Sequence, residues 1–228
     1  MITWMGKRLV GGGYRAPRYH VPSHPRLGEI EAIGRAIACA ALIDQPLMIF
    51  HVSTAEGAGV IHRARGEGRK VWGETCTQYL TLGARDLDRP GLDGAMWMCS
   101  PPLREPSDQE ALWWALEIGA LQAVSSDHAP YRMDASGKLA KGPDAHFKEI
   151  ANGMPGVELR LPVLFDAMVS RGRLGLEKFV ELTATAPARI YGLHQRKGSI
   201  AIGLDADIAI WDPAHTVEIA QGDRKSVV

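Results

Sequence analysis

The sequence predicts an α/β fold in which parallel strands are joined by helices, and three observations lead to this prediction. Short apolar segments at residues 47–52, 70–76 and 121–127 have the composition of buried strands. Stretches with helical periodicity separate these segments, as parallel connections require. Gly or Pro ends most of the helical stretches, so each unit of strand and helix is tightly delimited.

The first part of the chain contains the elements that surround the first two strands. After a short helical start, the Gly- and Pro-rich segment 11–25 is typical of an irregular connector. A helix is predicted from Pro25 to about Asp44, because apolar residues recur there every three or four positions: Leu27, Ile30, Ile33, Ile37 and Ala41. Residues 56–65 form a second predicted helix, which ends at Gly66 and Gly68.

The next elements surround the third strand. Residues 77–106 are expected to be irregular because they contain several prolines and glycines. Ser107 and Glu110 have the spacing of a capping box, which predicts a helix starting at Ser107. After the strand, residues 130–155 form a long polar loop, and a loop of this length in a compact domain often covers a functional site.

The last part of the chain changes character. Helices are predicted over residues 157–170 and 176–185, followed by a helical turn at 187–193. Residues 198–213 then alternate apolar and polar side chains around a Gly-containing turn, which predicts a β-ribbon. The tail from His215 begins as a strand-like run and continues into a polar stretch with no structural prediction.

Composition excludes several classes of protein. The 228 residues carry a formal net charge of zero, so nothing favours nucleic acid or an anionic membrane as a partner. No apolar run approaches the roughly 20 residues of a membrane span, and the first residues do not resemble a signal peptide. The three cysteines form no CxxC pair, so we expect reduced thiols in a cytoplasmic protein rather than metal ligands.

Two polar residues stand where apolar strands end. Asp127 follows the third predicted strand, and His51 follows the first in a similar setting. The carboxyl ends of parallel strands meet at one edge of a sheet, where α/β barrels keep their catalytic groups. Asp127 taken alone is equally well explained as the cap of the next turn. Together with His51 it forms a candidate metal-binding pair, since imidazole and carboxylate both suit zinc.

With these segments in place, the chain resembles the cyclic amidohydrolases, specifically the hydantoinase and dihydropyrimidinase branch. The resemblance is carried, in order along nearly the whole chain, by HVSTAEG, GETCTQYL, SPPLRE, SSDHAP, ANGMPGVE and KGSIAIGLDADIAIWDP. The family implies a (β/α)8 barrel with a β-sandwich built from both chain ends. It also implies two divalent metal ions, usually zinc, bridged by a carboxylated lysine and a hydroxide.

The resemblance assigns roles to individual residues. It implies that His51 ends the sixth barrel strand and binds the more exposed metal ion. Asp127 would end the eighth strand, bind the other ion and act as the general base. Ser100 and Asn152 match positions that hold the cyclic amide, Asn152 through its main chain. Taken alone, Ser100 and Asn152 are better explained as turn residues before Pro and Gly.

Other histidines receive weaker assignments. His128, next to Asp127, is expected to support the site or its covering loop rather than to bind metal. His20 and His24 lie in the irregular connector and are expected to be surface residues. The remaining histidines have no polar cluster around them in the sequence and are expected to be structural or exposed: His62, His146, His194 and His215.

Parts of the family pattern are missing. There is no His-x-His, and no counterpart of the fourth-strand lysine or the fifth-strand histidine. The resemblance therefore predicts a C-terminal fragment, with residues 1–193 forming about strands six to eight of the barrel and residues 194–228 part of the β-sandwich. Zinc usually takes three or four protein donors, so the isolated chain is expected to be inactive. An unpaired strand edge would also make it poorly soluble.

Three functions follow from the resemblance. The favoured hypothesis is hydrolysis of a hydantoin or dihydropyrimidine ring to an N-carbamoyl amino acid by a homo-oligomer, tetramer or dimer. The alternatives are a non-catalytic scaffold, as among neuronal phosphoproteins of this fold, and an allantoinase or dihydroorotase. Retention of both His51 and Asp127 favours an enzyme over a scaffold. Ser100 favours the hydantoinase branch, because the other two enzymes tend to carry a different residue before the Pro-Pro pair.

Overall fold

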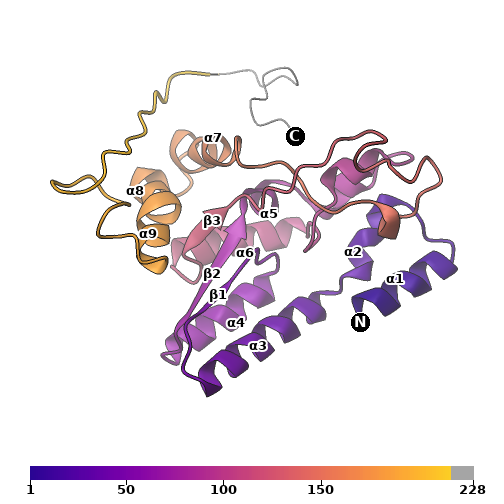
Figure 1. Ribbon diagram of the computed structural model, residues 1–228, viewed down its shortest axis with the longest axis horizontal. Coiled ribbons are helices and arrows are strands. Elements are labelled where there is room, and N and C mark those ends of the chain that lie inside the picture. Colours follow the sequence, from indigo (N-terminus) through magenta and orange to yellow (C-terminus); the bar gives the residue numbers. More distant parts are fainter. Residues whose placement is uncertain (217–228) are drawn as a thin grey trace.

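A three-stranded parallel sheet forms the centre of the computed structural model, which describes residues 1–216 (Figure 1). The strands are short: β1 Leu47–Ile49, β2 Val71–Cys76 and β3 Ala123–Ser125. Their order is β1-β2-β3, with Leu47 opposite Val71 and Glu74 opposite Ala123. The predicted parallel α/β arrangement is confirmed, and the carboxyl ends of all three strands lie at one edge.

Three long helices accompany the strands. Helix α3 Arg26–Leu42 precedes β1, helix α4 Ala55–Gly66 joins β1 to β2, and helix α6 Pro106–Glu117 joins β2 to β3. Helix α4 packs against α3, α6 and β2, and α3 and α4 run side by side in Figure 1. The apolar periodicity of the sequence therefore located these helices correctly.

The start of α6 differs from the expected capping box. Glu105, not Ser107, is the N-cap residue, and its main-chain N–H donates to the Asp108 carboxylate at 3.3 Å. Pro106 occupies the first helical position, where its fixed φ and missing N–H are tolerated. The capping pair predicted from Ser107 and Glu110 is therefore wrong by two residues.

The connecting segments contain more helical turns than their composition predicts. The N-terminal connector follows helix α1 Ile2–Gly11 and includes two turns, η1 Pro17–Tyr19 and α2 His20–Ser23. The segment after β2 includes three: α5 Thr77–Thr81, η2 Ala84–Leu87 and η3 Asp93–Trp97. The loop after β3 extends to the end of the molecule that carries α1 and α2 (Figure 1). At that end the loop forms the short turn η4 Phe147–Glu149. The N–H of Phe147 donates to the Arg15 carbonyl at 2.9 Å.

The predicted C-terminal helices are present. The first consists of α7 Arg160–Phe165 continued by the π-helical turn η5 Asp166–Ser170. The second consists of α8 Gly175–Val180 continued by the π-helical turn η6 Glu181–Thr185, and the short helix α9 Ala186–Ile190 follows it. The η6 turn packs on β3, so these helices cover the β3 side of the sheet.

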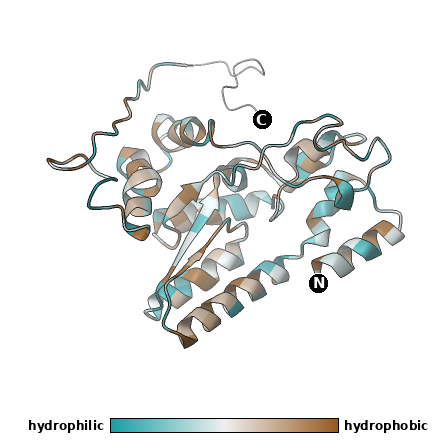
Figure 2. Ribbon diagram, viewed as in Figure 1, coloured by the Kyte–Doolittle hydropathy of each residue, from teal (hydrophilic) through white to brown (hydrophobic). Residues whose placement is uncertain are grey.

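The core lies between the strands and the helices. Its fully buried side chains include Ile61, Leu112, Leu116 and Leu121. Cys76 and Cys99 are buried free thiols, as expected, whereas Cys39 is exposed. Figure 2 shows strongly apolar residues at the C-terminal end of α3, outside this core. Within residues 1–216, no helix is long and apolar enough to cross a bilayer.

The β-ribbon predicted over residues 198–213 is not formed. The described part of the chain has no strand there, and the alternating isoleucines are largely exposed: Ile200, Ile202, Ile208 and Ile210. A two-stranded ribbon is stable only when its apolar face packs on another layer, and the described residues offer none. Residues 217–228, with most of the tail, lie outside the described residues. The domain division at residue 193 stays a prediction.

Candidate functional site

The two proposed metal ligands lie just beyond the carboxyl ends of the outer strands. His51 follows β1 by two residues, and Asp127 follows β3 by two. Both have a left-handed backbone, with φ of 45° and 43°, which is uncommon for residues other than Gly. Strands β1 and β3 are two strand spacings apart, about 10 Å, a separation large enough for two ions about 4 Å apart between the two strand ends.

Glu74 on the central strand lies between these two residues. Its side chain is buried, and Oε1 accepts a hydrogen bond from the Ser125 hydroxyl at 2.7 Å. Burial raises the pKa of the Glu74 carboxyl, while hydrogen bonds from Ser125 and the His51 main chain lower it. The charges of His51 and Asp127 both act on this carboxyl, so the strand ends bring all three groups within electrostatic range.

The sequence patterns do not single out Glu74. The available signal is a carboxylate inside the otherwise apolar segment KVWGETC. Buried carboxylates with shifted pKa values are enriched at functional sites, which adds Glu74 to the candidate residues.

The two proposed substrate contacts are joined through one main-chain segment. The N–H of Gly153, next to Asn152, donates to the Met98 carbonyl at 2.9 Å. The buried ammonium of Lys138 donates to the same oxygen, also at 2.9 Å. Met98 precedes Ser100 by two residues, so these bonds hold Asn152 and Ser100 near each other. The side chains of Ser100 and Asn152 are both exposed.

His20 supports the same segment from the N-terminal side. Its Nε2–H donates to the Cys99 carbonyl at 2.8 Å and lies 3.5 Å from the Ser100 hydroxyl oxygen. Only 1% of His20 is exposed, so the expected surface position is wrong. Burial and the neighbouring His24 lower the pKa of His20 to about 3, so this imidazole is neutral. Its burial arises from contacts with distant residues, which local composition does not reveal.

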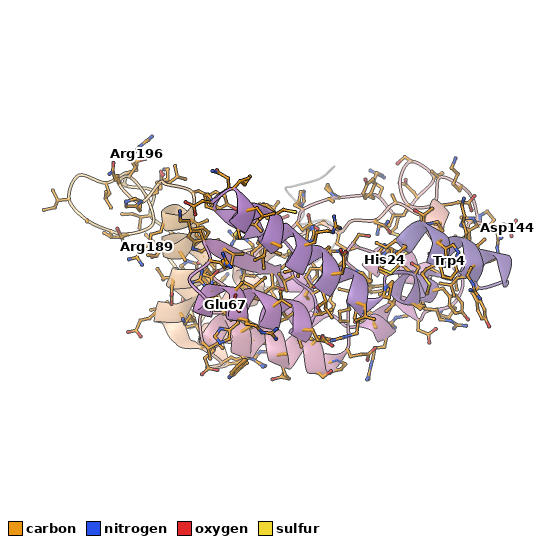
Figure 3. The ribbon with its side chains drawn as sticks, turned by 90° about the horizontal axis from the view of Figure 1, so that it is seen from below. Trp4, His24, Glu67, Asp144, Arg189 and Arg196 are labelled. Atoms are coloured by element: carbon orange, nitrogen blue, oxygen red, sulfur yellow. The ribbon has the colours of Figure 1, made fainter. Side chains whose placement is uncertain are left out.

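His24 is half-buried, and its ring centroid lies 4.3 Å from that of His20. In Figure 3, His24 lies at the end of the molecule that carries Trp4, far from Arg189 and Arg196. The connector therefore contributes one fully buried and one half-buried histidine next to Ser100.

His128 ties the chain after Asp127 to the segment after Asn152. Its Nδ1 accepts the main-chain N–H groups of Gly156 and Val157, at 3.0 and 3.2 Å. The turn that carries Asp127 is therefore fixed by its neighbour, which agrees with a supporting role for His128.

An apolar cavity of about 640 Å³ opens beside His51. It lies between β1, α3 and the turn at Ser100, and both His51 and Ser100 line it. Asp127 and Asn152 do not belong to its lining. The structure thus places His51 and Ser100 on the cavity, whereas Asp127 and Asn152 lie outside its lining.

The described residues fit part of a metal site. Imidazole and carboxylate are suitable donors for zinc, and their strand-end positions match each other. No cluster of three or more His, Cys, Asp or Glu side chains able to hold an ion occurs within residues 1–216. Since zinc takes three or four protein donors, His51 and Asp127 can supply only part of a ligand set.

Parallel strands with polar side chains at their carboxyl ends are the arrangement on which proteins of the α/β barrel class build their sites. Residues 35–228 match the model of the Amidohydrolase family, and the chain belongs to this family.

Individual relatives extend this result. The D-hydantoinase of Rhizobium radiobacter is 42% identical over 218 residues, which cover 96% of this chain and 47% of the relative. A solved D-hydantoinase structure matches with a TM-score of 0.91 and 40% identity, covering 97% of this chain and 48% of that one. The dihydropyrimidinase of Brevibacillus agri matches with a TM-score of 0.85 and 42% identity, covering 90% and 44%.

The chain spans about half the length of the curated relatives it matches, and the match lies in their C-terminal part. The prediction of a C-terminal part of a (β/α)8 amidohydrolase barrel is confirmed.

Proposed function

We propose that the whole protein to which these residues belong is a metal-dependent hydrolase that opens a hydantoin or dihydropyrimidine ring to an N-carbamoyl amino acid. The observation that carries the proposal is the placement of His51 and Asp127 at equivalent strand ends on either side of the buried Glu74. Relatives named D-hydantoinase match nearly the whole chain, which supports the substrate class. A scaffold protein would not require the matched backbone strain at both positions.

Each residue has a distinct role in this proposal. His51 and Asp127 would hold two divalent ions, for which zinc has suitable chemistry, together with ligands outside this chain that include a carboxylated lysine. Such ions lower the pKa of the water that attacks the ring carbonyl. Asp127 accepts the proton of that water and passes it to the leaving ring nitrogen. The Ser100 hydroxyl and the Asn152 main chain hold the cyclic amide.

We also propose that the whole protein is a cytoplasmic homo-oligomer that acts on small molecules. The two buried free thiols and the zero net charge support this setting.

The test is ring opening by the whole protein, measured on hydantoin, dihydrouracil, allantoin and dihydroorotate in parallel, with bound metal quantified by elemental analysis. Turnover of hydantoin or dihydrouracil is expected, and Asp127→Asn should abolish it. Asp144→Asn is the matched control, since Asp144 is exposed and lies at one end of the molecule (Figure 3). Turnover of none of the four substrates by metal-loaded protein would refute the proposal. The 228 residues alone are expected to be inactive.

A further inference from the structure

Asn152 is the only asparagine among the 228 residues, and Gly153 follows it. The side-chain amide of asparagine is chemically labile before glycine, because the main-chain nitrogen of a residue without a Cβ reaches the asparagine Cγ with little steric hindrance. The Asn152 side chain is exposed, and within residues 1–216 no hydrogen bond holds its amide. The chain therefore carries the reactive groups of a deamidation site at a proposed substrate contact.

The packing around position 153 requires glycine. A Cβ on Gly153 would clash with the Ala129 carbonyl oxygen and would lie 2.7 Å from the Ala129 Cβ and 2.9 Å from the Tyr131 ring. The Ala129 N–H donates to the carbonyl of the next residue, Met154, at 3.0 Å, so the two segments pack main chain against main chain. The labile Asn-Gly pair is therefore a consequence of this close approach.

The same packing keeps the Gly153 nitrogen from reacting. Its N–H donates to the Met98 carbonyl at 2.9 Å. The nitrogen must turn toward the Asn152 side chain and lose its proton before it can attack, so this hydrogen bond has to break first. Gly153 is buried, and the contact with Ala129 leaves its main chain little space to turn.

Lys138 fixes the acceptor of this hydrogen bond. The Lys138 side chain is buried, and its ammonium donates to the Met98 carbonyl at 2.9 Å and to the Ala95 carbonyl at 2.7 Å. The loop after β3 is thereby tied to the segment that precedes Ser100. Local opening of a loop costs less free energy than global unfolding, and opening here would release the Met98 carbonyl and the Gly153 N–H together.

We propose that Asn152 is a self-modification site, and that the hydrogen bonds of Lys138 and Gly153 to the Met98 carbonyl restrain its deamidation. When the segment opens, the Gly153 nitrogen forms a bond to Cγ of Asn152, and the bond from Cγ to Nδ2 breaks. The side-chain nitrogen leaves as ammonia with the proton lost by Gly153, and a cyclic imide remains. Water then opens the imide at one of its two carbonyls and gives aspartate or isoaspartate.

Both products change the proposed substrate contact. Isoaspartate adds a methylene group to the main chain and moves the carbonyl of residue 152, and aspartate places a negative charge on the side chain. A loss of ring opening as the protein ages therefore rests on the proposed function. The deamidation itself rests only on the Asn-Gly pair and its packing.

The experiment is a timed incubation of the whole protein at neutral pH, followed by trypsin digestion and mass spectrometry of the peptide of residues 149–160, in which Asn152 is the only side-chain amide. The mass increase from amide to carboxylate measures deamidation, and chromatography separates isoaspartate from aspartate. A synthetic peptide of the same residues gives the unrestrained rate. The folded protein is expected to react at least about tenfold more slowly than this peptide.

Three variants test the restraint and the site. Lys138→Met removes the charged donor to the Met98 carbonyl and should speed deamidation about tenfold relative to the unchanged protein. Lys141→Met, at an exposed position of the same loop, should leave the rate unchanged. Asn152→Gln should abolish the mass increase, because attack on the longer side chain requires a larger ring.

Circular dichroism establishes that each variant is folded. The proposal is overturned if folded Lys138→Met deamidates no faster than Lys141→Met, or if the unchanged protein reacts as fast as the synthetic peptide. Ring opening of hydantoin by fresh and aged protein is measured separately. A fresh protein that deamidates as expected but opens no ring would support the modification site and count against the proposed function.

Discussion

Replacing Glu29 on α3 by Gln is expected to lower the free energy of unfolding by about 3 kcal/mol, the lower end of the cost of breaking a buried ion pair. The Glu29 carboxylate lies 3.2 Å from the Arg104 guanidinium, and the two side chains are 10% and 6% exposed. The carboxylate also accepts the main-chain N–H groups of Ser53 at 2.9 Å and Thr54 at 3.1 Å. Gln keeps one acceptor oxygen but leaves Arg104 without its opposite charge.

For a chain of this size, the change corresponds to a fall in melting temperature of about 6–12 °C. Thermal and urea unfolding followed by circular dichroism measure it. Glu31→Gln is the matched control on the same helix, because its pair with Arg35 is 60% and 68% exposed and is worth at most about 1 kcal/mol. Equal losses for Glu29→Gln and Glu31→Gln would refute the reasoning, since burial would then not decide the cost.

Two further predictions concern the segment that carries Ser100. The pKa of His20 is about 3 in the folded chain against 6.5 in the unfolded chain. Between these pH values the unfolded chain therefore binds more protons than the folded chain. The free energy of unfolding consequently falls as the pH falls from about 6.5 toward 3, by up to about 1.4 kcal/mol per pH unit. His20→Asn should flatten this dependence in melting experiments relative to the exposed control His62→Asn, and equal slopes would contradict it. Lys138→Met removes the charged donor to the Ala95 and Met98 carbonyl oxygens and leaves each with only its main-chain donor. It should therefore lower the free energy of unfolding by about 1–3 kcal/mol and speed hydrogen exchange at Gly153. The exposed Lys141→Met should do neither, and unchanged exchange at Gly153 in Lys138→Met would exclude the role of the ammonium.

The sequence predicts the elements whose signals are local. Isoleucines on one helical face, such as Ile33 and Ile37, locate α3, and the polar residues after apolar segments locate the strand ends. Burial that depends on distant partners is not visible in this way. His20 is buried because Cys99 and its neighbours close over it, although its sequence neighbours are those of a surface loop.

The failed β-ribbon has the same cause. Alternating side chains around Gly203 specify which residues could face a core, but a ribbon forms only where a second layer supplies that core. Within this segment Trp211 does find an apolar partner, stacking on Phe165 with ring centroids 4.7 Å apart. Trp211 packs on a partner ring, whereas Ile202 in the same segment is exposed. The alternation therefore indicates which side chains can be buried, and a neighbouring apolar surface decides whether they are.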